Sequence, residues 1–341
     1  NLPVQRGKRA LFICGPGNNG GDGYVAADLL FKQGMEIDIY CPISKAKESN
    51  DNLHYKQKLN KSLFVSKIRS LSNYCYVVDA LFGTGLSRTM SNDLSSLVSK
   101  INQSKLDVFS VDIPSGINGD TSAVLGEAFK ASKTITFFNK KKCHYLYPGK
   151  KYCGEIVVED IGIKKNVLNN IMPNIKKNDP SLWIKNFPFP VSSDHKYSRG
   201  MLVINTGPQF QTGAARLAGR SAMRVGAGAV TMVCDEETAK ILEPQISVEL
   251  LSVIKEKNDF QKLLKDKRVS SVLVGPGNGV NDETKARVLM ALAFVDHCVI
   301  DADAITCFEN NPEELFIDTY PHTILTPHEL SLIHISEPTR P

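Results

Sequence analysis

The glycine-rich run Gly15–Gly23 is the stretch of this chain whose residue types and spacing say most about its chemistry. The run follows Ala10–Cys14, an apolar segment that predicts a strand, and it leads into Tyr24–Gln33, which predicts a helix. Glycines between a strand and a helix let backbone N–H groups approach a ligand, and a helix N-terminus favours negative charge. The run therefore predicts a site for a phosphate-bearing molecule, to which two carboxamides and a carboxylate add side-chain chemistry.

Two common phosphate-binding motifs do not explain this run. Gly15, Gly17 and Gly20 have the spacing of the dinucleotide fingerprint, which alone is weakly specific. The next predicted strand, Ile37–Tyr40, holds Asp38 in its interior, whereas the fingerprint needs an acidic residue at the strand tip to bind a ribose. The run also lacks the Gly-Lys-Ser/Thr of a P-loop. A turn without a ligand is the remaining alternative, and the polar cluster disfavours it.

Two further predicted strands end in an aspartate followed by a glycine-containing turn. Asp79 closes the apolar run that begins at Tyr76, and Asp112 closes the run that begins at Val108. Ligands of parallel α/β sheets bind outside the carboxyl ends of the strands, so we expect both aspartates and the glycine-rich run to converge. Clustered carboxylate, carboxamide and hydroxyl oxygens suit a hard cation or ribose hydroxyls. Each aspartate could instead cap the following helix.

The C-terminal half carries a separate set of motifs. Residues 164–190 are rich in Asn, Lys and Pro and predict a linker, after which a new α/β pattern begins at His195. Its predicted strands include Met201–Asn205 and Ala229–Cys234. The motifs are His195–Gly200, Gly213–Ala215, Gly226–Gly228, Val274–Gly279, Ile300–Ala304 and Leu325–Glu329. Taken singly, each has an ordinary structural explanation as a strand-exit turn or a helix cap.

Length and composition limit the functional classes. A chain of 341 residues is long enough for two domains, each with its own core. The net charge of +5 is mild and the basic residues are scattered, so nucleic acid is not an expected partner. The sequence has no apolar run near the roughly 20 residues of a membrane span, and we expect no membrane partner. Eight cysteines without a C-x-x-C pair indicate buried thiols in a reducing cytoplasm.

Four motifs of the first half, in order, resemble the NAD(P)H-hydrate epimerase domain: Gly15–Gly23, Val78–Leu86, Ser110–Asp120 and Lys142–Gly149. The resemblance implies a Rossmann-like domain over residues 1–163 that epimerises C6 of the hydrated nicotinamide ring and binds potassium. It implies potassium ligation by Asn19, Asp79 and Ser115. It also implies contacts to hydrated NADH or NADPH from Asn18, Asn19, Gly20, Gly21, Asp22, Gly83, Thr84, Gly85, Leu86, Ser87, Arg88, Thr89 and Asp112.

Asp112 is the candidate catalytic residue for that epimerisation. The 6-hydroxyl on a reduced nicotinamide ring is a hemiaminal, so loss and return of the hydroxyl, or opening and closing of the ring, needs an acid/base and no redox cofactor. Asp112 could instead be a carboxylate that only orients the substrate. The neighbouring lysines, Lys140–Lys142 beside His144, could meet a pyrophosphate or form a solvated face.

The motifs of residues 191–329 resemble the ADP-dependent NAD(P)H-hydrate dehydratase, which has a ribokinase-like fold. This resemblance implies ADP or ATP as a co-substrate, with magnesium as a further candidate, and dehydration of the S hydrate. It implies contacts to the hydrated nucleotide from Ala214, Gly277 and His328. Bifunctional repair enzymes carry both domains in this order. A ribokinase-like small-molecule kinase and a non-catalytic nucleotide-binding protein are the alternatives.

We expect the sequence to be incomplete at both ends. Epimerases of this kind usually carry helices before their first strand, whereas Ala10–Cys14 begins close to Asn1. Ribokinase-like enzymes continue past the region of Thr326–Glu329 with a Gly-Asp turn that supplies the catalytic base. Residues 330–341 lack that turn and resemble a translated sequencing adapter, which predicts a non-native tail and a chain that does not dehydrate the hydrate. The sequence is compatible with a homo-oligomer and does not define the oligomeric state.

Overall fold

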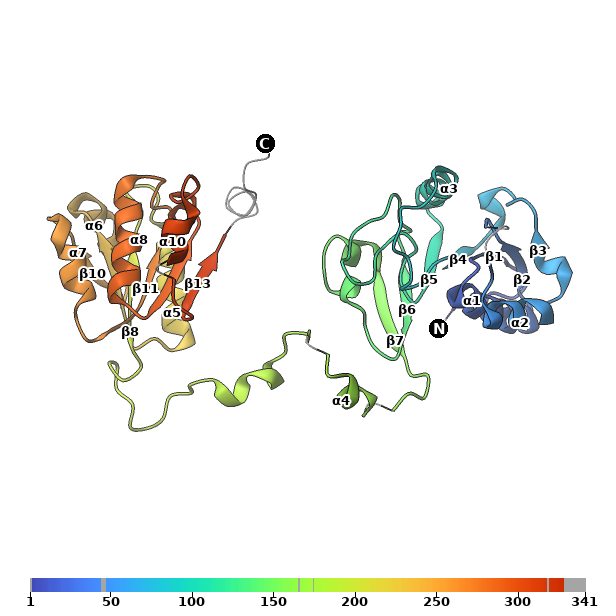
Figure 1. The fold of residues 1–341 in the computed structure, drawn as a ribbon, viewed down its shortest axis with the longest axis horizontal. Coiled ribbons are helices and arrows are strands. Elements are labelled where there is room, and N and C mark those ends of the chain that lie inside the picture. The colour runs from blue at the N-terminus through green and yellow to red at the C-terminus, as the bar shows by residue number, and fades with distance from the viewer. Residues whose placement is uncertain (1, 44–46, 165, 174, 318, 328–341) are drawn as a thin grey trace. The chain divides into compact units, whose positions relative to one another are not determined.

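A computed structural model describes residues 2–43, 47–164, 166–173, 175–317 and 319–327 (Figure 1). His328, Glu329 and the predicted tail 330–341 therefore lie outside the described residues. The chain divides into two compact units, Asn1–Lys176 and Lys177–Pro341. This division falls within the segment 164–190 for which a linker is predicted.

The first unit is built on a sheet whose described strand pairings are all parallel, in the order β3-β2-β1-β4-β5-β6-β7. The chain winds outward from β1 in one direction and then from β4 in the other, so the topological switch point lies between β1 and β4. The strands are β1 (Arg9–Cys14), β2 (Glu36–Tyr40), β3 (Phe64–Val65), β4 (Tyr76–Ala80), β5 (Asp107–Val111), β6 (Lys133–Phe137) and β7 (Glu155–Glu159). The predicted Rossmann-like sheet is confirmed.

Helices cover both faces of this sheet. Leu11 and Phe12 are adjacent in β1 and both are fully buried, in two different hydrophobic clusters, as expected for a parallel sheet that is covered on both sides. The helices are α1 (Asn18–Lys32), α2 (Asn50–Lys58), α3 (Asn92–Gln103) and α4 (Val167–Ile171), and α1 and α2 lie side by side (Figure 1). Short 3₁₀ turns are Lys61–Leu63, Leu71–Asn73, Lys142–His144 and Gly149–Tyr152.

The predicted start of the first helix was wrong, because α1 begins at Asn18 rather than at Tyr24. Glycine is a poor helix former, yet close packing requires it in this first part of the helix. A Cβ added at Gly20 would lie 2.0 Å from the carbonyl oxygen of Gly15, and one at Gly23 would lie 2.6 Å from Cβ of Ala80. The glycines therefore let the helix begin directly against the strand ends.

The second unit repeats the architecture, with described strands in the order β10-β9-β8-β11-β12-β13 and parallel pairings throughout. The strands are β8 (Met201–Asn205), β9 (Ala229–Cys234), β10 (Leu250–Val253), β11 (Val269–Val274), β12 (His297–Asp301) and β13 (Thr323–Thr326). The strands predicted at 201–205 and 229–234 have the predicted bounds. The expected second α/β sheet is confirmed.

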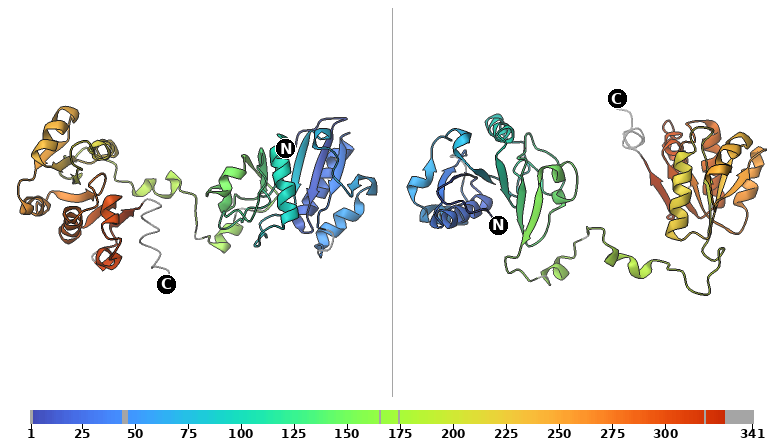
Figure 2. Two further views of the ribbon diagram at one scale, coloured as in Figure 1. Left: turned by 90° about the horizontal axis from the view of Figure 1, so that it is seen from above. Right: turned by 180° about the vertical axis from the view of Figure 1, so that it is seen from behind.

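The helices of the second unit also lie on both faces of its sheet. α8 lies in front of the sheet in Figure 1, and α5 lies in front when the unit is seen from behind in Figure 2. The helices are α5 (Gly213–Val225), α6 (Glu236–Leu242), α7 (Lys257–Leu264), α8 (Asp282–Phe294), α9 (Asp303–Thr306) and α10 (Pro312–Ile317), with 3₁₀ turns at Pro180–Leu182, Ile184–Asn186 and Glu243–Gln245. Among the described residues, no helix combines the length and the apolar character needed to cross a membrane.

Candidate functional site

The carboxyl ends of β1, β4 and β5 lie next to one another at the switch point of the first sheet. Ile13 of β1 pairs with Asp79 of β4, and Asp79 pairs with Ser110 of β5. The segments that leave these strands are the glycine-rich run into α1, the loop from Leu81, and the turn that contains Asp112 and Ser115. The predicted site residues of the first unit are therefore carried by three neighbouring strand ends, where ligands of doubly wound sheets bind.

Asp79 is a fully buried carboxylate held by hydrogen bonds from the adjacent turn. Its Oδ1 accepts from Oγ of Ser115 at 2.6 Å and from the backbone N–H of Leu81 at 3.3 Å. Its Oδ2 accepts from Oγ of Ser110 and from the backbone N–H of Ser115, both at 2.8 Å. Burial raises the pKa of Asp79 to about 6, although these hydrogen bonds act in the opposite direction. The structure thus brings the predicted potassium ligands Asp79 and Ser115 into direct contact.

The third predicted potassium ligand, Asn19, lies at the start of α1 beside the loop that follows β4. A Cβ added at Gly83 would lie 3.3 Å from Oδ1 of Asn19. Within the described part of the chain, the buried Nδ2 of Asn19 has no hydrogen-bond partner. Oγ of Ser115 also lies 3.1 Å from the carbonyl oxygen of Phe82. A carboxylate, a hydroxyl, an amide and a backbone carbonyl are oxygen donors of the kind that hard cations prefer, so these residues fit a potassium ion.

A divalent metal centre of the usual kind is not indicated. Over the described ranges of the chain, no group of three or more His, Cys, Asp or Glu side chains could hold a metal ion. The oxygen atoms around Ser115 are those of the Asp79 carboxylate and the carbonyl of Phe82, which lie 2.6 Å and 3.1 Å from its hydroxyl.

Asp112 follows β5 with a left-handed backbone, at a φ of +68°. Its backbone N–H donates to the carbonyl oxygen of Ile135 at 2.7 Å. Its Oδ1 accepts from Nζ of Lys141 at 2.5 Å and from Oγ1 of Thr136 at 3.0 Å. Aspartate is one of the few residues other than glycine that adopt this region readily, so the chain can turn here directly after β5.

Asp22 of α1 lies close enough to Asp112 for the two carboxylates to influence each other. Desolvation by the surrounding protein, and then the negative charges of Asp112 and Asp51, raise the pKa of Asp22 to about 6. Two carboxylates at one strand-end cluster, one of which binds a proton near neutral pH, are suited to acid/base chemistry. This proximity supports the predicted convergence of the glycine-rich run with the end of β5.

The lysines that the sequence presents as one run have different surroundings. Nζ of Lys140 lies over the ring of Tyr145, and Nζ of Lys142 pairs with Asp120 at 3.2 Å. Lys141 is the member of the run that contacts Asp112. Sequence reasoning missed this distinction, since it depends on how the chain turns after β6.

The loop with Gly83–Thr89 lies at the rim of the site. Thr84, Gly85 and the segment 87–89 are exposed, whereas Leu86 is buried. The carbonyl oxygen of Leu86 accepts from Nδ2 of Asn118 at 3.2 Å, which fixes the loop to the turn after β5. The exposed members of this loop are therefore available to a ligand, and Leu86 anchors them.

Two of the predicted ligand-binding glycines have a packing role in the structure. Gly20 and Gly21 are buried, and a Cβ at either position would approach Asn52 of α2. The fully buried Asn52 donates from Nδ2 to the carbonyl oxygens of Gly15 at 2.9 Å and Gly17 at 2.8 Å. Asn52 thus holds the glycine-rich run in place, and sequence reasoning missed it because it lies outside every motif.

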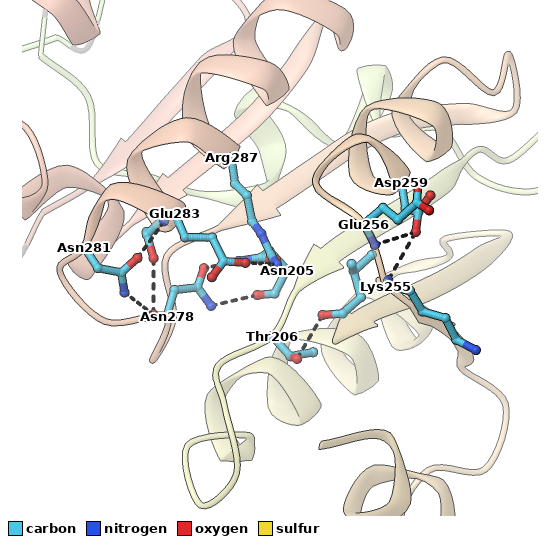
Figure 3. A network of polar contacts seen from close by, with 11 residues as sticks. Asn205, Thr206, Lys255, Glu256, Asp259, Asn278, Asn281, Glu283 and Arg287 are labelled. Atoms are coloured by element: carbon cyan, nitrogen blue, oxygen red, sulfur yellow. Dashed lines mark hydrogen bonds and ion pairs between the residues drawn. The ribbon is translucent and has the colours of Figure 1, made fainter. Parts of the chain in front are cut away.

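The second unit contains a cavity of about 670 Å³ at the carboxyl ends of its strands. Figure 3 shows the polar network beside it, in which Arg287 of α8 reaches Asn205 at the end of β8. Nδ2 of Asn205 donates to Oδ1 of Asn278 at 2.8 Å, and the guanidinium of Arg287 lies 5.6 Å from the ring centre of Phe260. The charged residues that line the cavity are Asp235, Lys255, Glu256, Asp282, Glu283 and Arg287.

Of the predicted residues of the second unit, Ala214 and Gly277 are not among the residues that line this cavity, although Gly277 directly precedes the lining residue Asn278. Ala214 is exposed in the first turn of α5. Gly277 adopts a φ of +68°, and a Cβ there would lie 2.8 Å from the carbonyl oxygen of Gln211, just before α5. Gly277 and the start of α5 are therefore neighbours. The third predicted residue, His328, lies outside the described residues.

The first unit is thus a doubly wound α/β domain with a polar cluster at its switch point. Residues 2–143 match the family described as YjeF-related protein N-terminus, and residues 201–333 match the family described as NAD(P)H-hydrate dehydratase. The chain is 39% identical over 158 residues to the NAD(P)H-hydrate epimerase of Oenococcus oeni, covering 46% of this chain and 75% of that protein. The chain belongs to the NAD(P)H-hydrate epimerase family.

Longer relatives match across both units. The bifunctional NAD(P)H-hydrate repair enzyme Nnr of Dictyoglomus turgidum is 31% identical, over 88% of this chain and 61% of that protein. The enzyme of the same name from Thermofilum pendens is 32% identical, over 94% of this chain and 64% of that protein. The chain thus spans about three fifths of the length of these relatives. A solved structure, the ADP/ATP-dependent NAD(P)H-hydrate dehydratase of Bacillus subtilis, is 23% identical with a TM-score of 0.35, over 44% of this chain and 51% of that one.

Proposed function

We propose that the first unit interconverts the R and S forms of NADH or NADPH hydrate at the carboxyl ends of β1, β4 and β5. The observation that carries this proposal is that Asn19, Asp79, Ser115 and Asp112 lie on segments at three neighbouring strand ends, in a chain that belongs to the NAD(P)H-hydrate epimerase family. The eight cysteines are free thiols, which supports action in a reducing compartment such as the cytoplasm.

The chemistry needs only proton transfer. In one route the C6–O bond breaks, the hydroxyl takes a proton and leaves as water, and the N1 lone pair forms a C6=N1 bond. Water then adds to the opposite face and releases a proton. In the other route the hydroxyl loses its proton, a carbonyl forms as the C6–N1 bond breaks, and N1 takes a proton until the ring closes on the opposite face. Asp112 is the proposed acid/base group for either route.

The dinucleotide is proposed to bind across the start of α1 and the rim loop. α1 has 15 residues and begins at Asn18, so its N-terminus favours the negative charge of a pyrophosphate. Arg88, which is exposed on the rim loop, adds a cation that can pair with a phosphate. Asn18, Asp22 and the exposed part of 84–89 would hold the rest of the hydrated nucleotide.

Potassium is proposed to bind Asn19, Asp79 and Ser115. When bound, it would supply a fixed positive charge beside the substrate. We expect potassium chloride, compared with sodium chloride at the same ionic strength, to raise the melting temperature of the wild-type chain. Asn19→Ala should lose this difference. An equal effect of both salts on the wild-type chain would contradict the assignment.

The second unit is proposed to bind the S hydrate, the substrate of the ADP-dependent dehydratase reaction, rather than to turn it over, with Ala214 and Gly277 as contacts to the hydrated nucleotide. The match of residues 201–333 to the NAD(P)H-hydrate dehydratase family favours this assignment over a small-molecule kinase or a non-catalytic protein. ADP or ATP with magnesium would be the co-substrate. Gly277→Ala should weaken binding of the S hydrate measured by calorimetry, because an added Cβ would lie 2.8 Å from a backbone oxygen. Gly226→Ala is the control, because Gly226 also has a positive φ but a Cβ added there would meet no atom within 4 Å.

The epimerase proposal is tested with purified R hydrate of NADH. The wild-type chain should convert it to the S hydrate, followed by chromatography that separates the epimers. Asp112→Asn should lower the rate by about 10²–10⁴-fold, the usual contribution of a general acid or base, while leaving binding of the hydrate measurable. A near wild-type rate for this variant would refute the assignment of Asp112.

A further inference from the structure

The ammonium group of Lys141 is fully engaged with the protein. Its Nζ donates to Oδ1 of Asp112 at 2.5 Å, to Oγ1 of Thr136 at 2.7 Å and to the carbonyl oxygen of Phe137 at 3.2 Å. A lysine ammonium has three N–H donors, so these contacts use all of them. The Lys141 side chain is only 23% exposed. Lys141 is therefore built into the fold beside Asp112 and has no donor left for a substrate phosphate.

The two oxygens of Asp112 have different surroundings. Oδ1 accepts from both Lys141 and Thr136, and Oγ1 of Thr136 is itself an acceptor from Lys141. Within the described residues, Oδ2 of Asp112 has no hydrogen bond or ion pair with the protein. Oδ2 is not fully buried, so it retains access to solvent. One oxygen is tethered and the other is open.

The positive charge beside Asp112 comes from Lys141 rather than from the nearby histidine. The backbone N–H of Lys141 donates to Nδ1 of His144 at 3.0 Å, and His144 is buried. Burial, and then the charge of Lys141, lower the pKa of His144 to about 4, so the imidazole is neutral at neutral pH. Since Lys140 and Lys142 contact Tyr145 and Asp120, Lys141 is the cation that balances this carboxylate.

We propose that Lys141 is the positioning residue of the epimerase site: together with Thr136 it tethers Oδ1 of Asp112, so that Oδ2 is the atom that exchanges a proton with the hydrated nicotinamide ring. The inference rests on the proposed epimerase function and adds to it the atom that acts and the residues that hold it. Thr136 is fully buried in β6, and the tether therefore links the end of β5 to the strand next to it. Without the tether the carboxylate can rotate, and a misplacement of about 1 Å can lower a rate by about 10²-fold.

The test compares Lys141→Met, Lys141→Arg and a control in epimerisation of the R hydrate by the full chain. Lys141→Met should lower kcat by about 10²-fold with little change in KM, because Lys141 acts on the catalytic group and not on the substrate. Lys141→Arg keeps a cation and should restore part of kcat. The control is Lys133→Met, which breaks another lysine–carboxylate pair, with Glu155 at 3.1 Å, at the opposite end of β6. It should retain the wild-type kcat.

A double-mutant cycle tests whether Lys141 affects kcat through Asp112. In the Asp112→Asn background, Lys141→Met should cause little further loss of kcat, since its effect passes through Asp112. A raised KM with unchanged kcat would instead make Lys141 a substrate ligand, and unchanged constants would remove any role. Either result overturns the inference. If the wild-type chain does not interconvert the epimers, the proposed function fails. The tether is then tested by thermal unfolding of the wild-type chain, Asp112→Asn, Lys141→Met and the double variant. Additive effects of the two substitutions on the melting temperature would overturn it.

Discussion

Gly23→Ala should push α1 away from the first sheet and so displace the residues of the proposed site that lie at the start of this helix. An added Cβ would lie 2.6 Å from Cβ of Ala80 and 2.9 Å from Sγ of Cys14. Carbon atoms pack best at about 3.5 Å or more, so the helix must move by about 1 Å. Overpacking of this kind costs about 1–3 kcal/mol, and alanine in place of a helical glycine recovers about 0.5–1 kcal/mol. The net destabilisation spans about 0–2.5 kcal/mol, with a mid-range value of about 1 kcal/mol that is worth about 2–4 °C in melting temperature.

The same displacement should reach the chemistry, because Asn18 and Asn19 begin the helix that Gly23 anchors. We expect the epimerisation rate to fall by about 10²-fold. Thermal unfolding and the epimerisation rate should be measured on the same preparation. Gly17→Ala is the control for unfolding, since a Cβ at the N-cap Gly17 meets no atom within 4 Å. A Gly23→Ala protein with wild-type stability and rate would refute the packing argument.

Three further substitutions test other parts of the site. Ser115→Ala removes the hydroxyl that donates to the buried Asp79 at 2.6 Å, and should lower the free energy of unfolding by about 1–3 kcal/mol in urea titrations; no change would mean that water replaces the hydroxyl. Asn52→Ala should cost a similar amount, because two carbonyl oxygens of the glycine-rich run lose their donor. The pKa of Asp22 is raised by partial desolvation and by the charge of Asp112, although the residue is exposed, so solvent screens the effect. The raised pKa favours the folded state only while Asp22 is protonated, so this small contribution declines between about pH 4 and pH 6 and is absent above. In buffers above about pH 7, Asp22→Asn should therefore raise the melting temperature, and in buffers below about pH 4 it should change the melting temperature little. The opposite trend would contradict this pKa.

The fold and the positions of the candidate site residues at the strand ends were predictable because they depend on local patterns. Apolar runs such as Ala10–Cys14 give buried parallel strands, and an aspartate near the end of such a run lies at the carboxyl edge of the sheet. The contact between Asp79 and Ser115 follows from this arrangement. Residues spaced along the sequence as separate motifs meet in space because their strands are neighbours in the sheet.

The parts that the sequence did not reveal depend on packing between distant segments. The start of α1 at Asn18 opposes glycine's helix propensity and is decided by close contacts with Gly15 and Ala80. Asn52 reaches the glycine-rich run from 35 residues away in the sequence, without any motif to mark it. The choice of Lys141 among three adjacent lysines depends on the backbone path after β6. None of these contacts has a periodic or compositional signature.

The central claim is that this chain interconverts the two hydrate epimers. The most direct measurement incubates separately purified R and S hydrates of NADH with a catalytic amount of the wild-type chain and without ADP, and follows both by chromatography that separates the epimers. The account predicts that both samples reach the same R to S ratio, and reach it much faster than in buffer alone. Samples that approach that ratio no faster than in buffer alone would contradict it.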